Sequence, residues 1–365
     1  MPSSALRRHA AFALVFLLAA CDSGELSPTD DPLFEAKANL GEWTWIDVTG
    51  ARCRDGSATG FGVRLQPGAT DLAIYLEGGG ACFDATTCAL NDAEFTEADF
   101  QAGVATDGEV GIFSTRAENP VGDWNMVYVP YCTGDVHGGS APGTAVPGVD
   151  GLQQFVGHQN LELYLNAVQT SLATPDRVLL TGVSAGGFGA LVNFAEVADR
   201  FESSDLTMLD DSGPIPYENV VFSPELGEAF NALFNLSAAL PADAAPLFNR
   251  DGLEGIYGYY TARYPDANLG LSSYLEDSVI RFFFSGGQPD GEITGDEFAF
   301  GLRDIRDKAP TWRTYFALGD EHTFLRRDDR YYGTSAGVAM NEWVGDLIRG
   351  TAENVEPGTV AAAAR

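Results

Sequence analysis

A chain of 365 residues is long enough to bury a full hydrophobic core, either as one large α/β domain or as two smaller ones. Its 52 acidic residues outnumber its 21 basic residues and give a formal net charge of −31 at pH 7. This charge argues against nucleic acid and anionic membrane surfaces as partners. We interpret it as a solvating surface that identifies no substrate.

The N-terminus has the pattern of an export signal. Two arginines precede an apolar stretch at 10–20, which is too short to span a bilayer. The residues LAAC that end at Cys21 resemble the bacterial lipobox, in which the cysteine is lipidated and becomes the first mature residue. The sequence therefore predicts a lipoprotein signal over 1–20, with an ordinary secretory signal as the alternative. Residues 21–38 are predicted to be a flexible tether.

Strand-like and helix-like segments alternate between about residues 60 and 350, as in an α/β sheet. Several predicted strands are nearly all apolar, as expected for strands covered on both faces; the strands are 62–65, 71–77, 124–130, 177–181, 207–210, 279–285 and 311–317. Predicted helices span 151–173, 187–198 and 335–349. Residues 212–278 are predicted to form a helical insertion or lid within one domain at 39–350, and 351–365 a disordered tail.

Four cysteines follow Cys21, namely Cys53, Cys82, Cys88 and Cys132. An even number in an exported protein indicates two disulfides, and the sequence allows three pairings. One of these joins Cys82 to Cys88 across a short loop and leaves Cys53 with Cys132. A metal site is the weaker alternative, because the chain has no C-x-x-C and few histidines, so we expect no metal.

The run GVSAG at 182–186 carries the most chemical information. It matches the G-x-S-x-G nucleophile elbow, with an apolar strand before it and a helical pattern after it. The glycines permit a sharp turn that lifts the Oγ atom of Ser184 out of the sheet. The helix N-terminus then directs backbone N–H groups at developing negative charge. A Gly/Ser-rich turn without chemistry is the alternative, and the flanking segments favour the elbow.

A nucleophilic serine needs a base, and His322 is the best candidate. It lies in a polar loop after a predicted strand near the end of the chain, where hydrolases of this kind place their histidine. A surface histidine without a role is the alternative. His137, in a glycine-rich loop, is a candidate for contact with substrate, and His158, in a helical stretch, is interpreted as structural.

The acid of the triad is expected between the serine and the histidine in chain order. Asp290 is the first choice because it follows the predicted strand 279–285 in a loop that would aim a carboxylate across the sheet edge. Asp296 in the same loop is second, and Asp210 or Asp211 is third. Each could instead form a turn or cap a helix.

The oxyanion hole is expected at the glycine-rich run that follows the predicted strand 71–77. Glycines let the backbone approach a substrate carbonyl, so the amides of Gly79 and Gly80 are the predicted donors beside that of Ala185. The run is not a phosphate loop, because no Gly-Lys-Ser/Thr follows it. A hinge or tight turn is the alternative.

Four motifs, in this order, resemble the pectin acetylesterase and Notum carboxylesterase family over about residues 40–345: LEGGGACF at 76–83, VPYCTGDVH at 129–137, TGVSAGG at 181–187 and DEHTF at 320–324. The resemblance implies an extracellular α/β-hydrolase with a Ser-Asp-His triad that removes ester-linked acyl groups. In one branch the group is acetyl from pectin, and in the other it is a fatty acyl group from a lipidated protein. The resemblance implies Ser184 as nucleophile and His322 as base, and the pairing Cys82–Cys88 agrees with it. Where Notum-like members carry an aromatic residue beside the oxyanion glycines, this chain has Gly80.

The predicted fold is an α/β-hydrolase with a mostly parallel central sheet flanked by helices. The predicted function is hydrolysis of carboxylic esters, above all O-deacetylation of a pectin-like polysaccharide through an acyl-enzyme. A fatty-acyl deacylase or peptidase of the same fold is one alternative, and a non-catalytic binding lipoprotein is another. No cofactor is expected. The protein is predicted to be a monomer of the bacterial cell envelope, either lipid-anchored or secreted, that meets acylated carbohydrate or another small ester.

Overall fold

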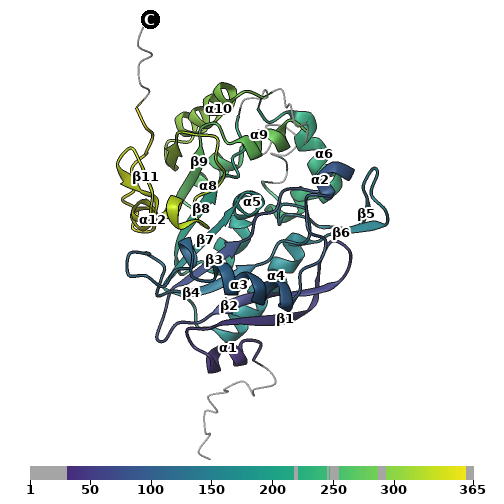
Figure 1. Cartoon of the computed structure of the whole chain (residues 1–365), viewed down its shortest axis with the longest axis vertical. Coiled ribbons are helices and arrows are strands. Elements are labelled where there is room, and N and C mark those ends of the chain that lie inside the picture. Colours follow the sequence, from purple (N-terminus) through teal and green to yellow (C-terminus); the bar gives the residue numbers. More distant parts are fainter. Residues whose placement is uncertain (1–30, 218–220, 245, 247–254, 287–292, 359–365) are drawn as a thin grey trace, which may run out of the picture.

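A central sheet organises the part of the chain that the computed structural model describes, which is residues 31–217, 221–244, 246, 255–286 and 293–358 (Figure 1). Within these residues the sheet has eight strands in the order β1-β2-β4-β3-β7-β8-β9-β10. The strands are β1 (Trp43–Arg52), β2 (Ala58–Arg64), β3 (Leu72–Leu76), β4 (Asn125–Val129), β7 (Arg177–Val183), β8 (Asp205–Asp211), β9 (Asn268–Tyr274) and β10 (Arg313–Ala317). From β4 to β10 they are parallel, and β1 and β2 join the edge in antiparallel pairing. The predicted mostly parallel sheet is confirmed.

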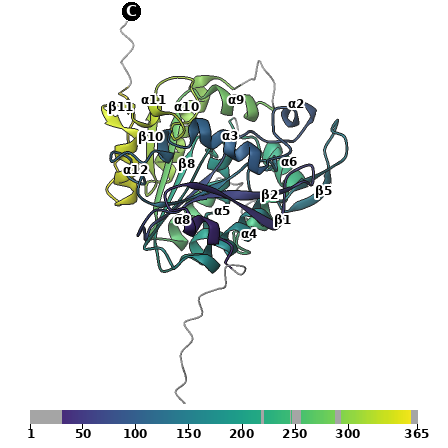
Figure 2. The ribbon, with the colours of Figure 1, turned by 60° about the horizontal axis from the view of Figure 1, so that its bottom comes forward.

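Helices cover both faces of this sheet. One face carries α4 (Gly157–Ser171), α5 (Ala185–Arg200) and α8 (Ile256–Arg263), and the other carries α3 (Glu97–Asp107), the short η1 (Gly111–Phe113) and α12 (Met340–Ile348). Figure 2 shows α3 on one side of the strands and α4, α5 and α8 on the other. The remaining helices are α1 (Phe34–Ala38), α2 (Ala85–Cys88), α6 (Pro224–Phe234), η2 (Leu236–Ala239), α9 (Ser278–Phe284), α10 (Gly295–Lys308) and α11 (Asp328–Tyr331). Two small hairpins pair β5 (Ala141–Ala145) with β6 (Leu152–Phe155), and β11 (Thr334–Ser335) with β12 (Val338–Ala339).

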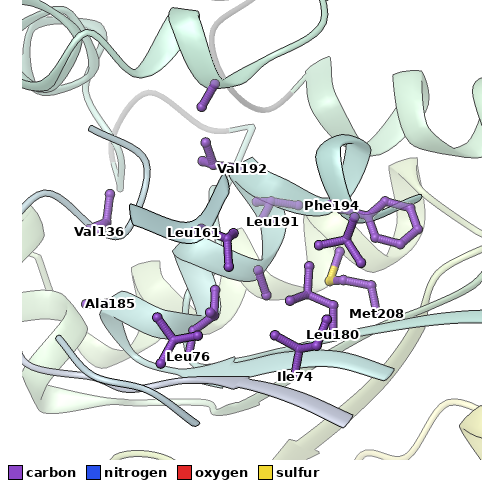
Figure 3. Close-up of a cluster of buried hydrophobic side chains, with 14 of the residues drawn as sticks. Ile74, Leu76, Val136, Leu161, Leu180, Ala185, Leu191, Val192, Phe194 and Met208 are labelled. Atoms are coloured by element: carbon purple, nitrogen blue, oxygen red, sulfur yellow. The ribbon is translucent and has the colours of Figure 1, made fainter. Parts of the chain in front are cut away.

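The apolar character of the strands follows from this three-layer arrangement. In β3, Leu72, Ile74 and Leu76 enter the core beneath α5, whereas Ala73 and Tyr75 enter the core on the opposite face. Figure 3 shows side chains of α5, Leu191 among them, packed over Ile74 and Leu76 of β3, Leu180 of β7 and Met208 of β8. This packing fixes the helix that begins directly after Ser184.

The structure corrects the predicted strand at 279–285, which is helix α9. Its residues are rich in phenylalanine and β-branched side chains, but Asp277 caps it by accepting hydrogen bonds from the amides of Val279 and Ile280, both at 3.0 Å. The neighbouring sheet strand is β9. It lies within the predicted insertion 212–278, so that segment is not wholly an insertion.

Both predicted ends of the domain are also corrected. Leu33 and Ala36 are fully buried, so the core begins inside the predicted tether 21–38. Near the other end, Val355 exchanges backbone hydrogen bonds with Thr314 and Phe316 of β10, so residues 351–358 pack on the sheet and are not a disordered tail. The predicted signal at 1–20 and Cys21 lie outside the described residues.

The two disulfides pair Cys53 with Cys132 and Cys82 with Cys88, which confirms one of the three possible patterns. Disulfides persist in oxidising compartments, so they indicate a protein that acts outside the cytoplasm. Among the described helices, none combines the length and the apolar character that a membrane span would need.

Candidate active site

Ser184 lies at the sharp turn between β7 and α5. Its φ of 57° and ψ of −121° fall in a region that residues with a side chain rarely adopt. A Cβ on Gly186 would lie 2.0 Å from the carbonyl oxygen of Leu76, and one on Gly182 would lie 2.3 Å from that of Gly186. Both glycines are therefore required sterically, which explains the G-x-S-x-G pattern as backbone packing around a strained serine.

His322 follows β10 and is oriented by a buried carboxylate. Its Nδ1 atom lies 2.7 Å from Oδ2 of Asp277, whose side chain is fully buried. We assign the proton to Nδ1 because an ionised carboxylate can only accept. The Nε2 atom is then left as an acceptor, which is the state that a general base requires. The other oxygen of Asp277 is the cap of α9 described above.

Asp211, at the end of β8, connects the serine to the histidine loop. Its Oδ2 atom accepts hydrogen bonds from the amides of Phe324 and Leu325 at 2.8 and 2.9 Å, and its carbonyl oxygen accepts one from the amide of Ser184 at 2.7 Å. Its Oδ1 atom accepts from the hydroxyl of Ser272. Burial raises the pKa of the Asp211 carboxyl to about 6, against the lowering effect of these donors.

A cavity of about 530 Å³ lies in front of these residues. Ser184 and His322 both line it, together with the glycine-rich loop 78–80. Its other lining residues are Ser278, Thr323 and Arg326, and the apolar Leu90, Val183, Val279, Phe282 and Phe283. A concave, largely apolar cavity with a few convergent polar groups is the usual form of a small-molecule site.

The glycine-rich loop offers amides to this cavity. Within the described parts of the chain, the amides of Gly79 and Gly80 have no protein acceptor. The amide of Ala185 is the first of α5 and is free of intrahelical bonding. A Cβ on Gly80 would lie 2.5 Å from Cζ of Phe283, so this phenylalanine occupies the space that a side chain at Gly80 would need. The three predicted oxyanion donors are therefore available near the serine turn.

The structure corrects the role expected of His137. It is only 2 % exposed and is not among the residues that line the cavity. Its Nε2 atom lies 2.7 Å from the carbonyl oxygen of Glu77, and its ring packs on that of Tyr131. Burial lowers the pKa of His137 to about 4, so the ring is neutral and donates through Nε2. It supports the glycine-rich loop from beneath and does not reach a substrate.

The acid that bonds to His322 is Asp277, which the sequence analysis did not select. Asp290, the predicted acid, lies outside the described residues. Asp296 is exposed in the first turn of α10. Oδ1 of Asp210 accepts from the amide of Gly213, and Oδ2 has no partner among the described residues. Burial raises the pKa of the Asp210 carboxyl. His158, interpreted as structural, contacts Asn193 at 2.7 Å.

Comparisons with known proteins find relatives of this chain both in sequence and in structure. A sequence model of the Pectinacetylesterase family matches residues 36–242. Palmitoleoyl-protein carboxylesterase notum1 of Xenopus laevis is 33% identical over 154 residues, which are 41% of this chain and 31% of that protein. Human palmitoleoyl-protein carboxylesterase NOTUM is 30% identical over 158 residues, which are 42% and 31%. The matches thus span about a third of the length of these curated relatives.

A solved structure of the Wnt deacylase Notum from Drosophila superimposes with a TM-score of 0.64 at 19% identity, over 86% of this chain and 95% of that one. This likeness supports the α/β-hydrolase-like fold. The family match includes Ser184 and the glycine-rich loop, and it ends before Asp277 and His322. Because the family model matches more than half of the chain, the chain belongs to the Pectinacetylesterase family.

Proposed function

We propose that the protein is a serine carboxylesterase. One observation carries the proposal: a serine on a strained strand-to-helix turn and a histidine bonded to a buried carboxylate line the same cavity. A nucleophile, a base and a residue that orients the base are the parts that acyl transfer through an acyl-enzyme requires. The amides of the glycine-rich loop and Ala185 add donors for an oxyanion.

The reaction runs in two halves. Nε2 of His322 takes the proton of the Ser184 hydroxyl as Oγ attacks the ester carbonyl carbon, and the carbonyl electron pair moves to the oxygen that the amides hold. The intermediate collapses, the alcohol leaves with the proton from His322, and the acyl group stays on Oγ. Water, deprotonated by the same histidine, then releases the acid. Asp277 keeps the imidazole in its tautomer and stabilises the positive form.

The substrate that we propose is an O-acetylated, pectin-like polysaccharide. The family match supports this choice, and an open cavity can accommodate an acetyl ester on a bulky alcohol. A longer acyl chain is the second candidate, because Leu90, Val279 and Phe282 give the cavity an apolar lining and relatives are named palmitoleoyl-protein carboxylesterases. Turnover of p-nitrophenyl esters of increasing chain length separates the two, and acetate release from acetylated pectin, xylan and small esters ranks the alcohols.

Ser184→Ala tests the reaction class. We expect it to lower turnover of p-nitrophenyl acetate by about 10⁴-fold or more while the protein stays folded. Ser204→Ala is the matched control, because that serine precedes β8, at the opposite end of the parallel strands. Turnover by Ser184→Ala close to that of the parent would remove the serine mechanism. Failure of a fluorophosphonate to label Ser184 would favour a binding protein without catalysis.

Attachment to a membrane is a separate part of the proposal. The lipobox-like sequence supports lipidation at Cys21 after export. Radiolabelled palmitate should enter the full chain in bacteria, and Cys21→Ser should abolish the label. No label in the parent would leave only a secreted form, and equal labelling of both proteins would show that the lipid is not on Cys21.

A further inference from the structure

Three carbonyl groups in and directly before the glycine-rich loop are held by buried side chains. His137 donates to the carbonyl of Glu77 at 2.7 Å, Asn91 Nδ2 to that of Gly79 at 2.9 Å, and the Tyr131 hydroxyl to that of Gly80 at 2.7 Å. Gly79 and Gly80 have φ values of 157° and 78°, which glycine adopts without strain, so their peptides could rotate if these bonds were absent. The side chains therefore fix which way the loop amides point.

Asn91 acts on the peptide that joins Gly79 to Gly80. A peptide unit is planar and trans, so its C=O and N–H point in opposite directions. Both glycines line the cavity, whereas Asn91 does not and is only 6 % exposed. Asn91 therefore contacts the carbonyl from behind the loop, and the N–H of Gly80 points away from it, toward the cavity.

Asn91 is in turn bonded to a buried cation. The Nε atom of Arg54 donates to Oδ1 of Asn91 at 3.2 Å, and Nη2 donates to its carbonyl oxygen at 2.7 Å. The other hydrogen bonds of Arg54 go to the Cys88 carbonyl and the Gln153 side chain. The negative charges of Asp55 and Asp92 act on Arg54, but in the described parts of the chain neither forms an ion pair with it. Burial lowers the pKa of the guanidinium, which nevertheless stays charged at neutral pH. A fixed positive charge thus lies behind the glycine-rich loop.

We propose that Arg54 and Asn91 are positioning residues that orient and polarise the Gly80 amide for the oxyanion, an inference that rests on the proposed function. The cation withdraws electron density from the Asn91 amide, which strengthens its bond to the Gly79 carbonyl. The polarised peptide then donates more strongly through Gly80 N–H when the carbonyl electron pair of the ester moves to oxygen. Neither side chain touches the substrate.

Asn91→Asp is the decisive variant. The aspartate still accepts from Arg54 and gives that cation a counter-charge, which supports folding, but it has no donor for the Gly79 carbonyl and cancels the positive charge. We expect kcat for p-nitrophenyl acetate to fall by about 10- to 100-fold, somewhat less than the loss of a direct oxyanion donor, with KM within about twofold. Affinity for a trifluoromethyl ketone, which forms a tetrahedral adduct on serine, should fall by the same factor.

Asn160→Asp is the matched control. Asn160 is 5 % exposed and also donates through Nδ2 to a backbone carbonyl, that of Arg52, but it does not line the cavity. This variant should change the free energy of unfolding and leave kcat per fluorophosphonate-titrated site unchanged. Asn91→Gln, which keeps a donor, should recover part of the lost kcat.

The outcomes separate this inference from the proposed function. Turnover that requires Ser184 but stays within about threefold of the parent in Asn91→Asp, with unchanged affinity for the ketone, overturns the role of Arg54 and Asn91 alone. An equal loss of kcat in Asn160→Asp also overturns it, because the effect would then be one of stability. Turnover that does not require Ser184 removes the proposed function and this inference together.

Discussion

Replacement of Asp277 by asparagine separates the catalytic role of this side chain from its structural role. The carboxylate accepts three hydrogen bonds: one from His322 and two from the amides of Val279 and Ile280 at the start of α9. An asparagine keeps one oxygen for the two amides, and asparagine caps helices about as well as aspartate does. Its NH₂ group, however, would face Nδ1 of His322.

A donor at that place forces the imidazole into the other tautomer. Nδ1 then has to accept, the proton moves to Nε2, and Nε2 can no longer take the proton of Ser184. From the corresponding exchange in serine proteases we expect kcat to fall by about 10⁴-fold. This loss equals about 5.4 kcal/mol in the activation free energy. The free energy of unfolding should change by no more than about 1 kcal/mol, because the helix cap survives.

The assay is turnover of p-nitrophenyl acetate per titrated active site, with urea unfolding of the same preparations. Asp277→Ala should lose a similar factor in kcat. Because this change also removes the helix cap, its free energy of unfolding should fall by about 0.5–2 kcal/mol. Asp290→Asn tests the acid that the sequence analysis selected, and it should keep its activity. A kcat in Asp277→Asn above about a tenth of the parent value, or a loss of about 100-fold or more in Asp290→Asn, would refute the assignment.

Three further predictions concern the surroundings of the site. His137 has a pKa of about 4 when folded and about 6.5 when unfolded, so burial of its neutral form is fully tolerated only above about pH 6.5. Relative to His137→Gln, the parent should lose about 3 kcal/mol of unfolding free energy between about pH 6.5 and pH 4. Urea titrations measure this loss, and an equal pH dependence of the two proteins would contradict it. Phe283→Ala should open the space beside Gly80 and raise the ratio of kcat/KM for octanoyl over acetyl esters by about tenfold, and an unchanged ratio would exclude Phe283 as a wall of the acyl site. Acetylated pectin is a polyanion that the net charge of −31 repels, so added salt should lower KM for it but not for uncharged acetylated xylo-oligosaccharides. If acetate release from pectin shows no salt effect, the acidic residues lie away from the path by which the substrate reaches the cavity.

Local constraint explains which parts of the site the sequence predicts. Ser184 is recognisable because close backbone contacts at Gly182 and Gly186 leave no room for a side chain. Glycine is therefore required two residues before and two residues after the serine, which a short sequence pattern can detect. The strand before it is recognisable because both of its faces are covered. His322 was located by chain order, which follows from the order of the parallel strands. The glycines proposed as oxyanion donors are recognisable because they directly follow the apolar strand β3.

Long-range contacts explain what the sequence did not predict. The seven residues of α9 favour a strand by composition, and a helix this short is decided by its cap and its packing. Because 279–285 was interpreted as a strand, the acid was predicted after this segment, at Asp290, whereas the carboxylate that bonds to His322 is Asp277, directly before it. The residues next to His137 in the sequence do not indicate that its side chain is buried against the carbonyl of Glu77. The order of residues 351–358 depends on contacts with β10, about 40 positions earlier in the chain.

The hydrogen bonds already made by two buried carboxylates decide which of them can bond to His322. Asp211 is the last residue of β8, Asp277 follows β9, and both are fully buried. Asp211 already accepts the amides of Phe324 and Leu325 on one oxygen and the Ser272 hydroxyl on the other, so it holds the histidine loop by its backbone. Asp277 uses one oxygen for its helix cap and has the other free for the imidazole. Because the carbonyl oxygen of Asp211 also binds the Ser184 amide, β8 holds the serine turn and the histidine loop together, while the carboxylate after β9 bonds the imidazole of the proposed base.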